Sequence, residues 1–155
     1  MIIKGIIDED IINYKRISMT IMFPYCTFKC GSNNCQNSAL NKECNINIKT
    51  VDLIERYLQN PITEAIVCQG LEPFDSWNDL SHFIYVLRTS YHCSDMIVIY
   101  TGYNKDEITQ HINDLTAYKN IIIKYGRFIP NQNKHYDEIL GVNLSSDNQY
   151  AEQIS

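Results

Sequence analysis

The sequence predicts an α/β fold with a mostly parallel sheet and helices packed on its outer face. Short apolar segments alternate along the chain with longer segments of helical periodicity, as in repeated strand–helix units. Each of three motifs with chemical potential follows one of the apolar segments. Because ligands bind at the carboxyl ends of strands in parallel sheets, we expect one site at that edge.

Size and composition fit one globular domain. The chain has 155 residues, 45% of them hydrophobic, and a formal net charge of -5. We therefore expect a single domain over residues 1–155. Phosphate binding needs clustered Lys and Arg, so no nucleic acid is expected as a main partner. The sequence shows no secretory signal and no apolar run near the roughly 18 residues that span a bilayer, so we expect no membrane association and a cytoplasmic location.

The first two strands lead into a long loop. Residues 2–7 and 17–23 are apolar strand candidates, and Pro24 ends the second one. Residues 25–47 have neither helical nor strand periodicity and are rich in Asn, Ser and Cys. A loop of this length inside a small domain is usually functional, so we place the chemistry there.

A helix over residues 51–59 follows the loop, and Thr50 can cap it. Its apolar stripe at helical spacing consists of Val51, Ile54, Tyr57 and Leu58. Pro61 lies just past the helix end. Residues 65–68 then form a short apolar strand that runs into a turn.

The second helix covers residues 77–90, with Asp75 or Ser76 as its cap. Its apolar positions at helical spacing are Leu80, Phe83, Ile84 and Leu87. Residues 96–100 are the next apolar strand.

The last part of the chain gives weaker signals. A helix is expected over residues 105–115 and a strand over residues 120–124. Residues 126–155 are polar and show no sustained period, so we expect this tail to add little to the core. We assign it to the rim of the site or to a partner.

Three cysteines lie close together in the long loop. Three residues separate Cys26 from Cys30, and four separate Cys30 from Cys35. A cluster held by three thiolates keeps one iron free for a ligand, whereas four-cysteine sites usually only move electrons. Cys44 as a fourth ligand keeps structural zinc or a closed cluster open as alternatives. Three disulfides among the six cysteines are a further alternative, which the absence of a secretory signal disfavours.

Two turns follow the third and fourth strands. Gly70 lets the backbone pass close to a ligand, and the carboxylate of Glu72 suits a ligand ammonium group. Thr101 and Gly102 could bring hydroxyl and backbone groups to the same ligand. Plain structural turns are the alternative for both segments.

Together these segments resemble the radical S-adenosylmethionine proteins, and within them the small activating proteins of anaerobic ribonucleotide reductase. The cysteine loop resembles their cluster loop, Gln69-Gly-Leu-Glu-Pro73 their Gly-Gly-Glu-Pro turn, and residues 99–103 their Thr-Gly-Tyr turn. Residues 124–128 and 144–149 are similar to their Gly-Arg-Phe and Ser-Asn-Gln tail. The family's common spacing is CxxxCxxC with an aromatic residue before the third cysteine. Here the second gap is longer, and Asn34 takes the place of the aromatic residue.

The resemblance implies a partial (β/α) barrel and a role for each motif. Three irons of a [4Fe–4S] cluster would be held by Cys26, Cys30 and Cys35, and S-adenosyl-L-methionine would chelate the fourth. Gly70 and Glu72 would line the methionine end of that cofactor, with Glu72 facing its ammonium group. Thr101 and Gly102 would lie near its ribose or adenine.

The resemblance also implies a function and partners. Cleavage of S-adenosylmethionine to a 5′-deoxyadenosyl radical would activate a glycyl-radical enzyme such as anaerobic ribonucleotide reductase. The expected protein is thus an oxidoreductase of anaerobic metabolism. Its expected partners are the glycyl-radical large subunit and an electron donor such as flavodoxin or ferredoxin. A radical enzyme with another peptide or small-molecule substrate, and a non-catalytic iron–sulfur or zinc module, remain open as alternatives.

Overall fold

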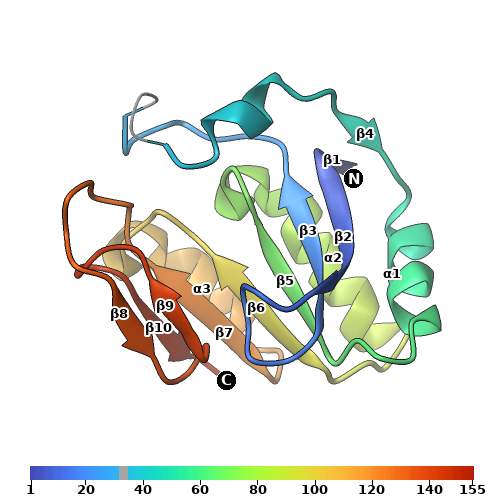
Figure 1. The fold of residues 1–155 in the computed structure, drawn as a ribbon. Helices are drawn as coiled ribbons and strands as arrows, with labels where there is room; N and C mark the ends of the chain where they lie inside the picture. The colour runs from blue at the N-terminus through green and yellow to red at the C-terminus, as the bar shows by residue number, and fades with distance from the viewer. Residues whose placement is uncertain (32–34) are drawn as a thin grey trace.

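A six-stranded sheet forms the centre of the computed structural model, which describes residues 1–31 and 35–155 (Figure 1). Its strands are β2 (Gly5–Asp10), β3 (Ser18–Phe23), β5 (Ala65–Gly70), β6 (Met96–Tyr100), β7 (Ile121–Tyr125) and β10 (Tyr150–Gln153). The spatial order is β10-β7-β6-β5-β3-β2. Neighbours from β3 to β7 pair in parallel, whereas β2 and β10 pair antiparallel at the edges. The predicted α/β class with a mostly parallel sheet is therefore confirmed. The partial barrel stays a prediction, because no strand pairing among the described residues closes the sheet.

Three α-helices pack against one face of this sheet. They are α1 (Thr50–Gln59), α2 (Trp77–Thr89) and α3 (Thr109–Leu115), and short 3-10 turns η1 (Ser38–Lys42), η2 (Pro73–Ser76) and η3 (Lys105–Ile108) accompany them. Their buried faces share one core cluster with alternate strand residues, among them Ile66, Ile97 and Ile121. The stripe predicted for α1 was partly wrong, because Val51 and Leu58 are exposed and Leu53 is buried beside Ile54 and Tyr57. The helix expected over residues 105–115 begins as η3, where Asn104 and Glu107 form a capping box. None of the helices in the described ranges has the length and hydropathy that a membrane crossing needs.

The opposite face of the sheet carries a second core cluster. Val67, Val98 and Ile122 point to this face, because side chains alternate along each strand. Towards the carboxyl ends of the strands the same face changes character. The strand register places four residues there in one row across the sheet, in the order Met22, Gln69, Tyr100 and Lys124. Polar and aromatic side chains thus replace the apolar core at this edge.

The tail contributes to the core, so the expectation of little core packing was wrong. It forms the hairpin of β8 (His135–Asp137) and β9 (Val142–Leu144), and then β10, which pairs with β7. Leu140, Leu144 and Ala151 are buried in the second core cluster. These residues lie in short apolar patches of a polar sequence, and their burial comes from strand pairing that no local period reveals.

The segment before the first core strand also differs from the prediction. The strand expected over residues 2–7 divides into β1 (Ile2–Ile3) and β2. β1 pairs with β4 (Ile46–Asn47), the end of the cysteine-bearing loop, while β2 pairs with β3. Because the strand breaks at Lys4, the two halves of residues 2–7 pair in two different sheets.

Candidate functional site

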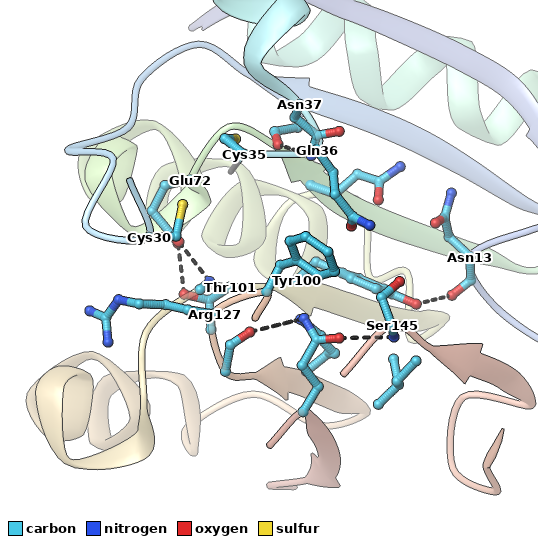
Figure 2. Close-up of a pocket in the computed structure, with 18 of the residues that line it drawn as sticks. Asn13, Cys30, Cys35, Gln36, Asn37, Glu72, Tyr100, Thr101, Arg127 and Ser145 are labelled. Carbon is cyan, nitrogen blue, oxygen red and sulfur yellow. Dashed lines mark hydrogen bonds between the residues drawn. The ribbon is translucent and has the colours of Figure 1, made fainter. Parts of the chain in front are cut away.

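A pocket of about 360 Å³ opens at the carboxyl ends of the parallel strands. Its walls come from the ends of β5, β6 and β7, the loop after β3, the β2–β3 loop and the segment around β9 (Figure 2). The residues that the sequence assigned to a cluster or cofactor all line it, namely Cys26, Cys30, Cys35, Gly70, Glu72, Thr101 and Gly102. The fold therefore brings together three motifs that are far apart in the chain.

The three thiols of the loop are partly buried at one end of this pocket. All six cysteines of the chain are free thiols. Burial raises the pKa of Cys26 to about 11, and burial together with the neighbouring Cys35 raises the pKa of Cys30. The backbone N–H of Phe28 donates to Cys26 Sγ at 3.2 Å. Without a metal, Cys26 and Cys30 therefore hold their protons at neutral pH, and metal binding would release these protons.

Asp75 fixes the first half of the cysteine loop. Its carboxylate accepts a hydrogen bond of 2.7 Å from the backbone N–H of Thr27 and one of 2.6 Å from the hydroxyl of Tyr103. Thr27 Oγ1 lies 3.2 Å from the same tyrosine oxygen. Asn37, after the third cysteine, donates to the carbonyl of Gly70 at 2.7 Å. Contacts at Thr27, between the first two cysteines, and at Asn37, after the third, thus tie the loop to the turns that follow β5 and β6.

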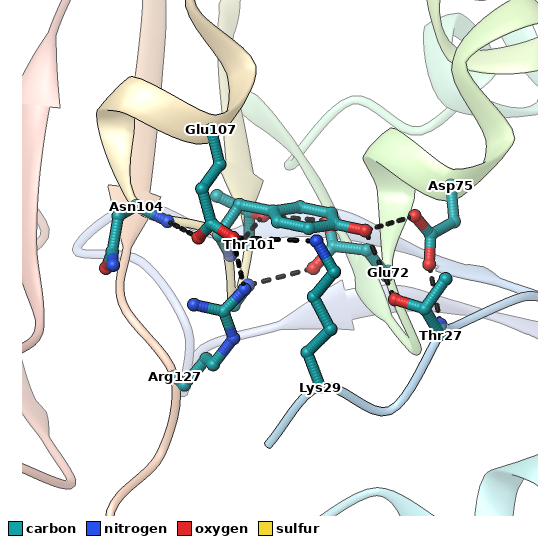
Figure 3. Close-up of polar contacts among 10 residues, drawn as sticks. Thr27, Lys29, Glu72, Asp75, Thr101, Asn104, Glu107 and Arg127 are labelled. Atoms are coloured by element: carbon teal, nitrogen blue, oxygen red, sulfur yellow. Dashed lines mark hydrogen bonds and ion pairs between the residues drawn. The ribbon is translucent and has the colours of Figure 1, made fainter. Parts of the chain in front are cut away.

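Lys29, Glu107 and Arg127 lie together (Figure 3), and the two cations of this cluster lie over the ring of Tyr103. Glu107 accepts a hydrogen bond of 2.7 Å from Arg127 and lies 3.6 Å from Lys29 Nζ. The Lys29 ammonium stands 4.8 Å from the centre of the Tyr103 ring, and the Arg127 guanidinium stands 5.6 Å from it. The bond from Arg127 lowers the pKa of Glu107 to about 2, so this carboxylate stays ionised. The loop, the turn after β6 and the segment after β7 therefore meet at one tyrosine.

Glu72 is buried and joins two turns. Its carboxylate accepts hydrogen bonds from Phe74 N at 3.2 Å, Thr101 Oγ1 at 2.8 Å and Gly102 N at 2.9 Å. Burial raises its pKa to about 7, which the three bonds oppose. The Thr101 hydroxyl also accepts from the backbone N–H of Tyr103 at 3.0 Å. The hydrogen bonds of Glu72 and Thr101 therefore join the turn after β5 to the turn after β6. A contact from either residue to a ligand would come in addition to this structural role.

Gly70 is required by the sheet itself. It has a φ of 103°, and a Cβ at this position would lie 2.8 Å from the backbone nitrogen of Phe23. Any side chain would push β5 away from β3, where the two strands pair in register. The glycine of this turn thus closes the floor of the pocket beside the cysteine loop.

Several pocket residues were missed by the sequence analysis. Lys124 is the next-to-last residue of β7, with 7% of its surface exposed, and Tyr100, Asn13 and Gln149 also line the cavity. The hydroxyl of Tyr100 donates to the carbonyl of Asn13 at 2.5 Å. The signal for Lys124 was a lysine at the end of an otherwise apolar strand. Asn13 gave no signal, because its loop reaches the site only through tertiary packing. Gln149 lies in residues 144–149, whose similarity to the tail of the activating proteins was its only signal.

The donor set suits a soft metal group. Cys26, Cys30 and Cys35 line one cavity, and thiolates are the usual ligands of iron–sulfur clusters. Within the described ranges, no three Cys, His, Asp or Glu side chains converge closely enough to hold a single metal ion. A cluster takes its thiolates on separate irons, so it does not need three side chains that converge on one point. Cys44 is exposed and is not among the residues that line the pocket. Asn34, expected in the place of the family's aromatic residue, lies outside the described residues.

A parallel α/β sheet with three thiols in a pocket at its carboxyl edge defines a metal- or cluster-binding domain. The family described as "4Fe-4S single cluster domain" matches residues 15–150, which include the whole pocket except its outermost rim. The chain belongs to this family and is thus an iron–sulfur-binding domain. No curated protein and no solved structure gives a significant match.

Proposed function

We propose that this protein is a radical S-adenosylmethionine enzyme whose [4Fe–4S] cluster is held by Cys26, Cys30 and Cys35. The observation that carries the proposal is that these thiols share one pocket with the turn of Glu72, Thr101 and Gly102. When bound, the cluster would supply one electron to S-adenosylmethionine, whose cleavage gives the 5′-deoxyadenosyl radical. A three-cysteine set leaves one iron for that cofactor.

The residues of the chain would bind and orient the cofactor. Glu72 would attract its ammonium group, because the carboxylate is buried and three hydrogen bonds fix its direction. Gly70 would line its methionine end, while Thr101 and Gly102 would lie near its ribose or adenine. Asp75 would keep the cysteine loop over the cavity through Thr27. Exclusion of water and fixed orientation are what a protein adds to cofactor chemistry.

We propose a glycyl-radical enzyme, such as anaerobic ribonucleotide reductase, as the protein substrate. The support is the similarity of residues 99–103 and 124–128 to the activating proteins, and both segments line or border the pocket. The reaction would need an electron donor such as flavodoxin or ferredoxin. The protein would then be an oxidoreductase of the activase type.

The test uses anaerobically reconstituted protein and electron paramagnetic resonance. An open iron predicts that the signal of the reduced cluster changes when S-adenosylmethionine is added. Replacement of Cys26, Cys30 or Cys35 by Ala should abolish the cluster, whereas Cys44→Ala, the matched control, should keep iron and sulfide content at the wild-type level. An unchanged signal, or loss of the cluster in Cys44→Ala, would instead identify a closed, non-catalytic iron–sulfur module.

A further inference from the structure

We propose that the part of the pocket beside β7 is a carboxylate-binding subsite, with Lys124 as the residue that pairs with a substrate carboxylate. Lys124 is buried, yet it lines a cavity large enough for a small ligand. A buried charge without a charged partner is costly, so such groups are normally paired. The structure offers a ligand as the missing partner.

The strand register separates Lys124 from the strand that leads into the cysteine loop. Tyr100 pairs with Lys124, and Met22 pairs with Gln69, so these residues form one row across four parallel strands. With neighbouring strands about 4.8 Å apart, Lys124 stands roughly 14 Å across the sheet from Met22, which leads into the cysteine loop. In Figure 2, Cys30 and Cys35 lie at one end of the pocket, Asn13 and Ser145 at the other, and Tyr100 between them.

The ammonium group of Lys124 has unused hydrogen-bonding capacity within the described residues. Its one hydrogen bond goes to the carbonyl of Gly126 at 3.0 Å, and the ring of Tyr100 lies 5.9 Å away. No carboxylate of the described chain forms an ion pair with it. An ammonium group has three donors, so two remain for a ligand. Burial lowers the pKa of Lys124 to about 8, and the nearby Glu72 counteracts that shift, so the group is mostly charged at pH 7.

A carboxylate fits this subsite better than a phosphate. Lys124 supplies one positive charge, and the other cation of the pocket, Arg127, is already bonded to Glu107. Glu72 brings partial negative charge to the same cavity near neutral pH, because burial raises its pKa to about 7. A singly charged group balances Lys124, whereas a dianion would add uncompensated charge.

The subsite deepens the proposed function by naming a substrate class. S-adenosylmethionine would place its own carboxylate at the cluster end, so the carboxylate at Lys124 would come from the substrate. In a polypeptide substrate it would be an acidic side chain close to the reacting glycine. This last step rests on the proposed function, but binding of a carboxylate by Lys124 does not.

The test uses the cluster-free full chain, so it is independent of radical chemistry. Acetate and inorganic phosphate are titrated separately, and the amide signals of Gly102 and Gly126 are followed by ¹H–¹⁵N spectroscopy. Wild type and Lys119→Met, a control that removes an exposed lysine, should bind acetate equally. Lys124→Met and Lys124→Gln should bind it roughly 10- to 100-fold more weakly, the effect of losing a charge-assisted hydrogen bond. Equal acetate binding in the Lys124 variants, or phosphate binding tighter than acetate binding in wild type, would overturn the proposal.

Two further measurements distinguish binding of a substrate carboxylate by Lys124 from a structural role and from a role in cofactor binding. Removal of an unpaired buried charge should leave the urea midpoint of Lys124→Met equal to or above that of wild type. Midpoints lowered in both Lys124 variants would show that the lysine is structural, against the proposal. In reconstituted protein, S-adenosylmethionine affinity should be the same in Lys124→Met and wild type. A loss there would move Lys124 to the cofactor and overturn the assignment to the substrate.

Discussion

Glu72 shows how one residue can couple pocket geometry to pH. Burial raises the pKa of its carboxylate from 4.5 to about 7, although three hydrogen bonds oppose the shift. The folded chain therefore binds this proton more tightly than the unfolded chain does. Its contribution to stability is fully present below about pH 4.5 and is lost as the pH rises through about 7. We expect the free energy of unfolding of the cluster-free protein to fall by up to about 3 kcal/mol across this range.

Urea unfolding at several pH values measures this effect. In Glu72→Gln the decline between about pH 5 and about pH 8 should be much smaller, because the titrating group is gone. Glu64→Gln, at a side chain that is 65% exposed, should decline as wild type does. A decline of the same size in all three proteins would mean that Glu72 is ionised throughout. A bound ligand ammonium would keep Glu72 charged and so flatten the wild-type curve.

At the scale of elements, the cysteine loop depends on the turn after β6. The hydroxyl of Tyr103 donates to Asp75 and lies beside Thr27, so it links that turn to the loop. Tyr103→Phe removes these bonds but keeps the ring under Lys29 and Arg127. We expect the loop to open more often and the reconstituted protein to lose iron roughly 5- to 30-fold faster to a chelator, as about 1–2 kcal/mol of lost hydrogen bonding predicts.

The matched control for this prediction is Tyr85→Phe. Tyr85 lies on α2 with 51% of its surface exposed, and its replacement removes a hydroxyl far from the loop. Iron loss in this variant should follow wild type. If Tyr103→Phe also releases iron at the wild-type rate, the loop is held by the cluster itself rather than by Asp75 and Tyr103.

The helices and strands that the sequence predicts are those whose burial follows from the apolar pattern of their own residues. The strand near residues 96–100 and the helix stripe from Leu80 to Leu87 are continuous or periodic, so composition alone locates them. β10 has only Ala151 buried in its polar stretch, and its pairing with β7 is a tertiary event. The same holds for the site residues. The motifs directly after predicted strands could be identified from the sequence, whereas Lys124 was overlooked because a lysine at a strand end usually reaches solvent.

At the scale of the whole molecule, the tail is part of the folding unit. Removal of residues 142–155 deletes β9 and β10, which exposes one side of β7 and uncovers the second core cluster. We expect this truncation to abolish the cooperative unfolding transition, measured by circular dichroism during heating. Deletion of Ser155 alone should leave it unchanged. A truncated chain that still melts cooperatively would show that the four central parallel strands, their helices and β2 suffice for folding.

The two walls of the pocket are made at very different times during synthesis. The cysteine loop leaves the ribosome early, whereas Lys124, Arg127 and the β9 segment that face it come from the last part of the described sequence. β7 gains its outer partner only when β10 arrives, so the cavity has no complete form before then. A nascent chain would carry its thiols unprotected throughout that interval. Cluster delivery is therefore best timed after β10 has paired with β7, and oxygen reaching the nascent thiols first would compete with it.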